Sequence, residues 1–114
     1  MIKIKRIYEL PARADGVRIL VDRLWPRGIR KDKARVDIWL RDLAPSSQLR
    51  KWFAHDMSKW ESFKRKYFKE LNENKDLIAQ IPKSPKGTIT FLYSAKDEKH
   101  NNALALKEYI NSRL

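Results

Sequence analysis

The sequence predicts an α/β fold: a single compact domain whose small, mostly parallel sheet is covered by helices in a Rossmann-like, three-layer arrangement. Two apolar runs, at 17–24 (VRILVDRL) and 88–95 (TITFLYSA), are typical of strands that are buried on both faces. A long stretch with mostly helical apolar spacing separates the two runs, and another helical stretch follows the second. A connection of that length favours parallel pairing of the two strands. With 114 residues, the chain is expected to form one domain, 1–114.

Residues 2–8 (IKIKRIY) begin the chain with alternating apolar and basic side chains. This period of two predicts a strand, and lysines on its open face are typical of an edge strand that avoids pairing with other chains. Pro11 and the pair Asp15-Gly16 then predict turns before the first buried strand.

Residues 34–43 (ARVDIWLRDL) fit two patterns. Val36, Ile38 and Leu40 alternate as in a strand, whereas Val36, Trp39 and Leu40 have helical spacing. We favour a helix here.

The middle of the chain predicts helices. Pro45 and two serines place the start of a short helix near Ser46 or Ser47. Ser58 and Glu61 have the spacing of a capping box, which predicts the start of a longer helix. The apolar face of this longer helix comprises Trp60, Phe63, Tyr67 and Leu71.

Two more helices are expected after it. Residues 74–81 predict a short helix that Pro82 ends, and a turn is expected at 83–87. The final helix falls within 96–114, with Ala103, Leu106 and Ile110 on one stripe. Asp97 is expected to cap it, and His100 would lie one turn inside it.

The composition limits the chemistry that the protein can perform. The chain has no cysteine, which excludes disulfides and thiolate chemistry and is compatible with a reducing cytoplasm, the expected location. The first residues lack the long apolar run of a signal peptide or membrane span, so no membrane partner is expected. No cofactor-binding motif occurs, and two histidines without cysteine give no matched set of metal ligands, so neither a cofactor nor a metal is expected.

The charge balance points to anionic partners. The chain has 26 basic and 14 acidic residues, a net charge of +12. Such a chain attracts nucleic acids, phosphorylated metabolites or anionic lipids.

Polar side chains gather where the two buried strands end. The segment 22–28 (DRLWPRG) follows the first strand, and 94–102 (SAKDEKHNN) follows the second. Ligands of open α/β sheets bind outside the carboxyl ends of the strands. If the strands are parallel neighbours, the two segments face each other across one crevice.

Candidate roles follow from the residue types. An anionic or phosphorylated small molecule would be bound, with Lys96 stabilising negative charge that develops on it. The ligand-binding candidates are Arg23, Trp25, Arg27, Gly28, Asn101 and Asn102, and the candidate acid–base groups are Asp22, Asp97 and His100. Each candidate also has a structural interpretation: Asp22 could pair with an arginine, Trp25 could plug a loop, and Gly28 could serve a turn. The residues therefore leave an enzyme and a non-catalytic binder as equal alternatives.

Nucleic-acid binding is a further alternative. It would use Arg30, Lys31, Lys33, Arg35, Lys64 and Arg65, although the sequence holds no recognised nucleic-acid-reading motif. A second histidine cluster, His55-Asp56, could tune a base but lies on an expected loop.

Three blocks of sequence occur in an order that resembles a known family. They are RILVDRLWPRG (18–28), WLRDLAPSSQLRKWFAHD (39–56) and FLYSAKDEKHNNALALKEYI (91–110). Together they resemble the YeaO-like proteins, a branch of the domain-of-unknown-function family DUF488. The resemblance implies a compact α/β domain. Longer relatives carry a Cys-His-Arg run near the last helix, where this chain has His100-Asn101-Asn102, so a thiol mechanism is not carried over.

Overall fold

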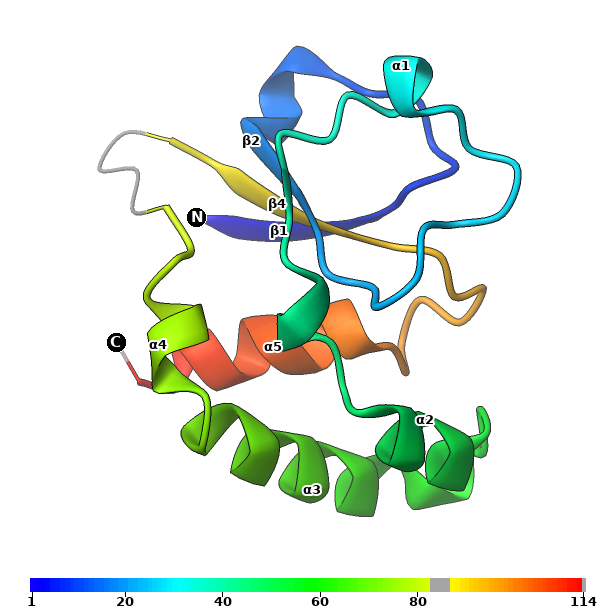
Figure 1. The fold of residues 1–114 in the computed structure, drawn as a ribbon, viewed down its shortest axis with the longest axis vertical. Helices are drawn as coiled ribbons and strands as arrows, with labels where there is room; N and C mark the ends of the chain where they lie inside the picture. The colour runs from blue at the N-terminus through cyan, green and yellow to red at the C-terminus, as the bar shows by residue number, and fades with distance from the viewer. Residues whose placement is uncertain (83–86, 114) are drawn as a thin grey trace.

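The computed structural model describes residues 1–82 and 87–113, and a four-stranded sheet forms its centre (Figure 1). The strands are β1 (Ile2–Arg6), β2 (Val17–Leu20), β3 (Ile38–Trp39) and β4 (Ile89–Tyr93), in the spatial order β1-β4-β2-β3. All the pairings in this sheet are parallel. The α/β prediction is confirmed, and the two apolar runs pair with each other as β2 and β4.

Both faces of the central strands are buried, as their near-continuous apolar character predicts. Ile19 of β2 and Phe91 of β4 are paired in register and face the main hydrophobic core. Their neighbours Leu20 and Leu92 face a second, smaller core on the other side of the sheet. Strand residues alternate between faces, so one sheet separates the two cores.

Helices cover one face of the sheet in two tiers. The helix α5 (Asn102–Asn111) packs on β1 and β4, and α3 (Trp60–Asn72) packs on α5, farther from the sheet (Figure 1). The helix α2 (Ser47–Phe53) packs beside α3, and the short α4 (Lys75–Ile78) follows α3. The predicted apolar face of α3 is confirmed, since Trp60, Phe63, Tyr67 and Leu71 are all buried. Ser46 caps α2 as expected, because its side chain accepts a hydrogen bond from the Leu49 amide.

A loop covers the other face of the sheet. Trp25 and Trp39 pack edge to face, 5.5 Å between ring centroids, against the smaller core. The loop contains one helical turn, α1 (Lys31–Ala34), which lies at the top of Figure 1. The second covering layer is therefore mostly loop, and Trp25 and Trp39 pack this loop against the sheet.

The prediction of a helix at 34–43 is wrong. The segment contains β3 and a 3-10 turn, η2 (Arg41–Leu43), and α1 ends where it begins. Ile38 and Trp39 pair with Ile19 and Leu20, so a tertiary partner decides a pattern that was locally ambiguous.

Two expected helix caps are also wrong. Ser58 lies in a 3-10 turn, η3 (Met57–Lys59), and bonds Asp56, whereas α3 starts after Lys59 without a side-chain cap. The final helix starts at Asn102 with Asn101 as its cap, so Asp97 and His100 both precede it. The turn predicted at 83–87 lies largely outside the described residues.

A buried ion cluster joins β1 and β2 through the 3-10 turn η1 (Arg13–Asp15). Asp15 is 6 % exposed and pairs with Arg18 and Lys5, and it also accepts a hydrogen bond from the Ala12 amide at 2.9 Å. Burial alone would raise the pKa of Asp15, but these donors and cations outweigh it and lower that pKa below its ordinary value. Arg18 also donates to the carbonyls of Ala34 and Arg35, which fixes the loop that follows α1.

Among residues 1–82 and 87–113, no helix combines the length and apolar character needed to cross a bilayer.

Candidate functional site

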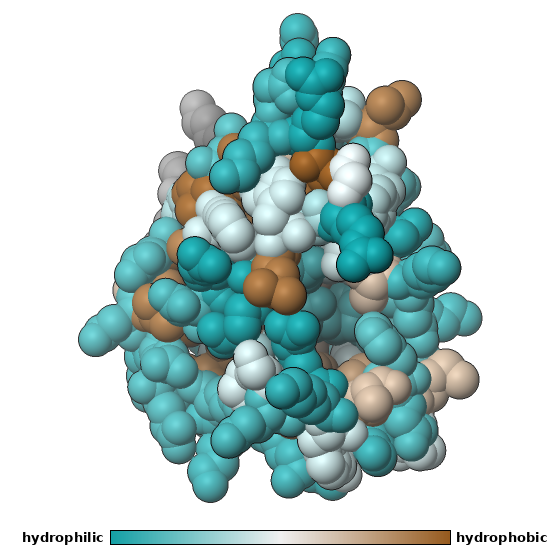
Figure 2. All heavy atoms as spheres, turned by 45° about the vertical axis from the view of Figure 1, so that its right-hand side comes forward, coloured by the Kyte–Doolittle hydropathy of each residue, from teal (hydrophilic) through white to brown (hydrophobic). Residues whose placement is uncertain are grey.

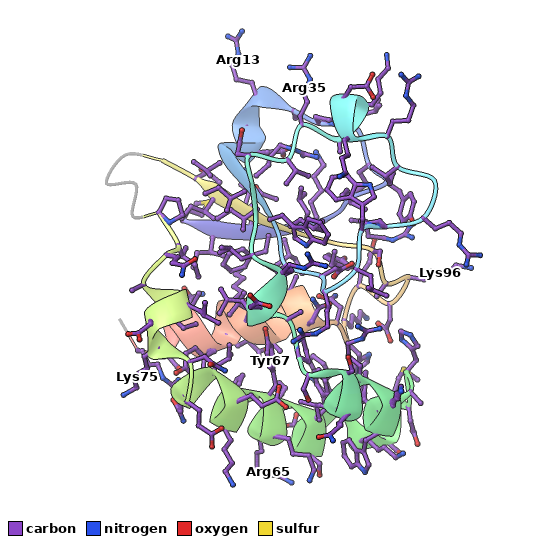
Figure 3. The ribbon with its side chains drawn as sticks, in the orientation of Figure 1. Arg13, Arg35, Arg65, Tyr67, Lys75 and Lys96 are labelled. Atoms are coloured by element: carbon purple, nitrogen blue, oxygen red, sulfur yellow. The ribbon has the colours of Figure 1, made fainter. Side chains whose placement is uncertain are left out.

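The segments that leave the carboxyl ends of β2 and β4 start side by side, because these strands are parallel neighbours. Both segments line one open groove with a volume of roughly 910 Å³. Figure 2 brings forward the side of the molecule on which Figure 3 places Lys96. This face is mostly hydrophilic, is hollowed near its centre, and carries hydrophobic atoms beside the hollow (Figure 2).

Asp22 connects the two strand ends and the last helix. One carboxylate oxygen accepts hydrogen bonds from the amide and the hydroxyl of Ser94, at 3.0 and 2.7 Å. The other accepts from the side-chain amide of Asn102, at 3.1 Å. The backbone carbonyl of Asp22 also accepts from the Trp39 indole, at 2.8 Å. The carboxylate thus fastens the strand ends together at the base of the groove.

Arg23 and Trp25 line the groove but are held by the protein itself. The Arg23 guanidinium donates to the carbonyls of Ala44 and Pro45, at 3.1 and 3.3 Å. The Trp25 indole donates to the carbonyl of Ile29 at 2.7 Å, and its ring packs against Trp39. Both residues shape the wall of the groove: the Trp25 indole N–H is fully engaged, and Arg23 is held by two carbonyls and by an ion pair with Asp42 at 4.0 Å.

Arg27 and Lys96 bring positive charge to the groove, and neither side chain has a polar partner among the residues that the structure describes. Both side chains are exposed and line it, one from each strand-end segment. Lys96 projects outward at the right-hand side of Figure 3. Gly28 follows Arg27 with a φ of 79°, a left-handed conformation that glycine adopts at little cost. Gly28 is exposed and turns the chain beyond Arg27.

Asp97 and His100 form a hydrogen-bonded pair on the wall of the groove. The Asp97 carboxylate lies 2.9 Å from Nδ1 of His100, and the other carboxylate oxygen accepts from the Lys99 and His100 amides. The Lys99 amide and, after it, His100 lower the pKa of Asp97 below its ordinary value. The imidazole edge packs on Trp60, with 5.3 Å between ring centroids. These contacts fix the histidine ring at the groove wall.

Asn101 and Asn102 have structural partners. Asn101 is 3 % exposed, caps α5 through the Leu104 amide at 2.8 Å, and donates to the Asp97 carbonyl. Asn102 donates to Asp22 and to the carbonyl of Val21, at 2.9 Å. Both amides hold the start of α5 against the strand ends.

The helix α2 and the segment after it add groove residues that the sequence did not single out for this site. They are Arg50, Lys51, His55 and Met57. Ala54 and His55 both have left-handed backbone conformations, with φ of 47° and 58°, which turn the chain sharply after α2. The cap at Ser46 predicts where α2 starts, but no signal in the sequence tells that α2 packs beside α3 and lines the groove.

The residues considered for nucleic-acid binding do not form one surface. Figure 3 places Arg35 at the top of the molecule and Arg65 at the bottom. Lys64 is paired with Glu61 and Glu108, at 3.5 and 3.1 Å, and Arg30 is paired with Asp32. Within the described ranges, no cluster of three or more histidine, cysteine or acidic residues is arranged to hold a metal ion.

Comparisons with known proteins match the chain over its whole length. It is 40 % identical to the Escherichia coli protein named Uncharacterized protein YeaO, over 97 % of each chain. It is 35 % identical to the Mycobacterium tuberculosis protein named Uncharacterized protein Rv3073c, over 98 % of this chain and 95 % of that one. No solved structure gives a significant match. A family model described as the inactive DUF488-N3 subclade matches residues 1–114. The resemblance to the YeaO-like branch is confirmed, and the chain belongs to the DUF488 family, within this subclade.

Proposed function

We propose that this protein binds a small, phosphate-bearing anion in the groove and does not transform it. The observation that carries the proposal is a set of cations without partners. In residues 1–82 and 87–113, four lysine and arginine side chains of the groove make no hydrogen bond or ion pair: Arg27, Arg50, Lys51 and Lys96. Arginine and lysine side chains that are free to donate are suited to phosphate oxygens.

Two of the three acid–base candidates, Asp22 and Asp97, are engaged in hydrogen bonds within the protein. Three hydrogen bonds already occupy the Asp22 carboxylate, and the Asp97 carboxylate is engaged by two amides and His100. A general base needs an oxygen or nitrogen within reach of the substrate proton. Nε2 of His100 has no hydrogen-bond partner among the described residues, so the groove wall keeps one group of this kind. Binding without turnover is supported by the description of the subclade as inactive.

The test is a titration of the protein with inorganic phosphate at low salt, followed by backbone amide NMR. We expect saturable shifts of amides around the groove. Lys96→Gln and Arg27→Gln should each weaken binding about three- to fivefold, because an exposed ion pair contributes up to about 1 kcal/mol.

Two variants provide matched controls, because they remove the same charge from exposed positions that do not line the groove. They are Lys99→Gln and Arg13→Gln. Equal weakening by the groove and control variants would contradict the proposal, since it would indicate attraction by net charge alone.

Nucleic-acid binding is a second candidate, favoured by the net charge of +12. Its weakness is that two of the candidate basic residues, Arg35 and Arg65, lie at opposite ends of the molecule, and two others, Arg30 and Lys64, are ion-paired. Fluorescence anisotropy with a labelled oligonucleotide at two salt concentrations tests it. Binding that weakens steeply with salt would favour this candidate, and no binding at either concentration would dismiss it.

A further inference from the structure

The groove combines unpaired cations with exposed apolar side chains. This combination indicates the chemistry of the part of the ligand that is not phosphate. Two of the large hydrophobic side chains with the greatest exposure line it: Leu24 is 63 % exposed and Met57 is 61 % exposed. Leu24 comes from the segment after β2, and Met57 from η3, which follows α2. Their apolar surface is thus presented from two separate parts of the chain to one groove.

The aromatic residues beneath them do not offer comparable surface. Phe53 and Phe63 also line the groove, but they are 7 % and 3 % exposed and pack on each other at 4.5 Å between ring centroids. Their faces are already covered by the core. Leu24 and Met57 are therefore the large hydrophobic side chains of the groove with the greatest exposed fraction, and the flexible thioether of Met57 adapts to different shapes.

The charges lie close to this apolar surface along the chain. Arg27 is three residues from Leu24, and Arg50 and Lys51 lie on the helix that leads to Met57. A bare inorganic anion would use the cations and leave both apolar side chains in water. A ligand with an apolar body joined to a phosphate would cover both kinds of surface.

We propose that the ligand of this groove is a phosphate monoester whose organic part is apolar, with the phosphate on the cations and the organic part on Leu24 and Met57. This inference rests on the proposed function, because it names the class of ligand that the same groove takes.

The experiment compares two monoesters, methyl phosphate and phenyl phosphate, by isothermal titration calorimetry on the whole protein. The two carry the same ionisable phosphate, and they differ in apolar area. We expect phenyl phosphate to bind about tenfold more tightly, as covering roughly 55 Å² of apolar surface would give. Leu24→Ser and Met57→Ser should each reduce this ratio at least twofold, because they should weaken the binding of phenyl phosphate more than that of methyl phosphate.

The control is Leu10→Ser, since Leu10 is 86 % exposed and does not line the groove. It should leave the ratio at about ten. Equal binding of the two esters, or a ratio that all three variants lower alike, would overturn the assignment of the organic part while the anion site stands. Binding of neither ester would overturn this inference and the proposed function together.

Discussion

A carboxylate at the end of a strand need not be there for chemistry, and Asp22 illustrates the alternative. Its two oxygens accept three hydrogen bonds, from the Ser94 amide, the Ser94 hydroxyl and the Asn102 side chain. These bonds connect the ends of two strands with the first residue of α5. A neutral amide of the same shape could not accept all three, because one of its two terminal atoms is a donor.

We therefore expect Asp22→Asn to destabilise the protein by about 1–3 kcal/mol, since a part-buried donor would lose its acceptor. Urea unfolding followed by circular dichroism measures the change. The control is Asp42→Asn, because the Asp42 side chain is 71 % exposed, and this variant should stay within about 0.5 kcal/mol of the native protein. Equal stability of the two variants would show that the charge of Asp22 is not needed for folding.

Some parts of the site could be predicted at the level of residues, and others could not. The convergence of Asp22 and Ser94 follows from the rule that parallel strands end at the same edge of a sheet. The engagement of Asp22 by Asn102 does not follow from any local pattern, because the two residues meet only when α5 docks. The sequence does not predict Arg50 and Lys51 as groove residues for the same reason, since their place beside the groove depends on how α2 packs.

At the scale of elements, two glycines in turns differ in the space available for a side chain. Gly16 and Gly28 both have positive φ angles, of 64° and 79°. A Cβ atom on Gly16 would lie 1.9 Å from the backbone oxygen of Thr88, next to β4, whereas one on Gly28 would meet nothing within 4 Å. The two positions thus share a positive φ, which strains an alanine, and differ in the clash.

Gly28→Ala should cost about 1–2 kcal/mol from the left-handed backbone alone. Gly16→Ala should cost about 1–3 kcal/mol more, because relieving the clash requires the start of β2 to move away from β4. Thermal or urea unfolding of the two variants gives the difference directly. Equal costs of the two alanines would show that the backbone at Gly16 can move away from Thr88 without a further loss of stability.

Elements with a strong periodic pattern were predictable, and those fixed by distant partners were not. The α3 stripe from Trp60 to Leu71 repeats every three or four residues, so one face of the helix had to be apolar. The strand β3 has two residues and exists because Ile38 and Trp39 meet β2. Asp97 was the predicted cap of the last helix, but Asn101 caps α5 in the structure. The Asp97 carboxylate instead accepts a hydrogen bond from the Lys99 amide within the preceding turn.

At the scale of the whole molecule, acid should destabilise this basic protein. The pKa values of Asp15, Asp56 and Asp97 lie below the ordinary value of 3.8 in the folded state. A carboxylate with a lowered pKa contributes stability that is present above its ordinary pKa and is lost as the pH falls through the folded pKa. Protonation also increases a net charge that is already +12.

We expect the urea midpoint to be steady near neutral pH and to fall as the pH drops below about 4. Asp15→Asn should make this acid-dependent loss smaller, and should cost about 3–5 kcal/mol at neutral pH because Arg18 would remain buried without its partner. A series of unfolding curves between neutral and acidic pH tests both points. A loss in the variant as steep as in the native protein would mean that Asp15 is not one of the groups responsible.

The spatial order of the strands also affects when the sheet can form during synthesis. The strand β4 lies between β1 and β2, yet it is the last strand along the chain. During synthesis, β1 and β2 have no central partner until residues 89–93 have emerged, so we expect the sheet to form late and in one step. Ribosome-bound chains that end before residue 87 should then show no protected amides in β1, whose strand partner is β4, and protection there would rule out this order of events. The groove, whose walls leave the ends of β2 and β4, would be among the last parts of a newly made molecule to exist.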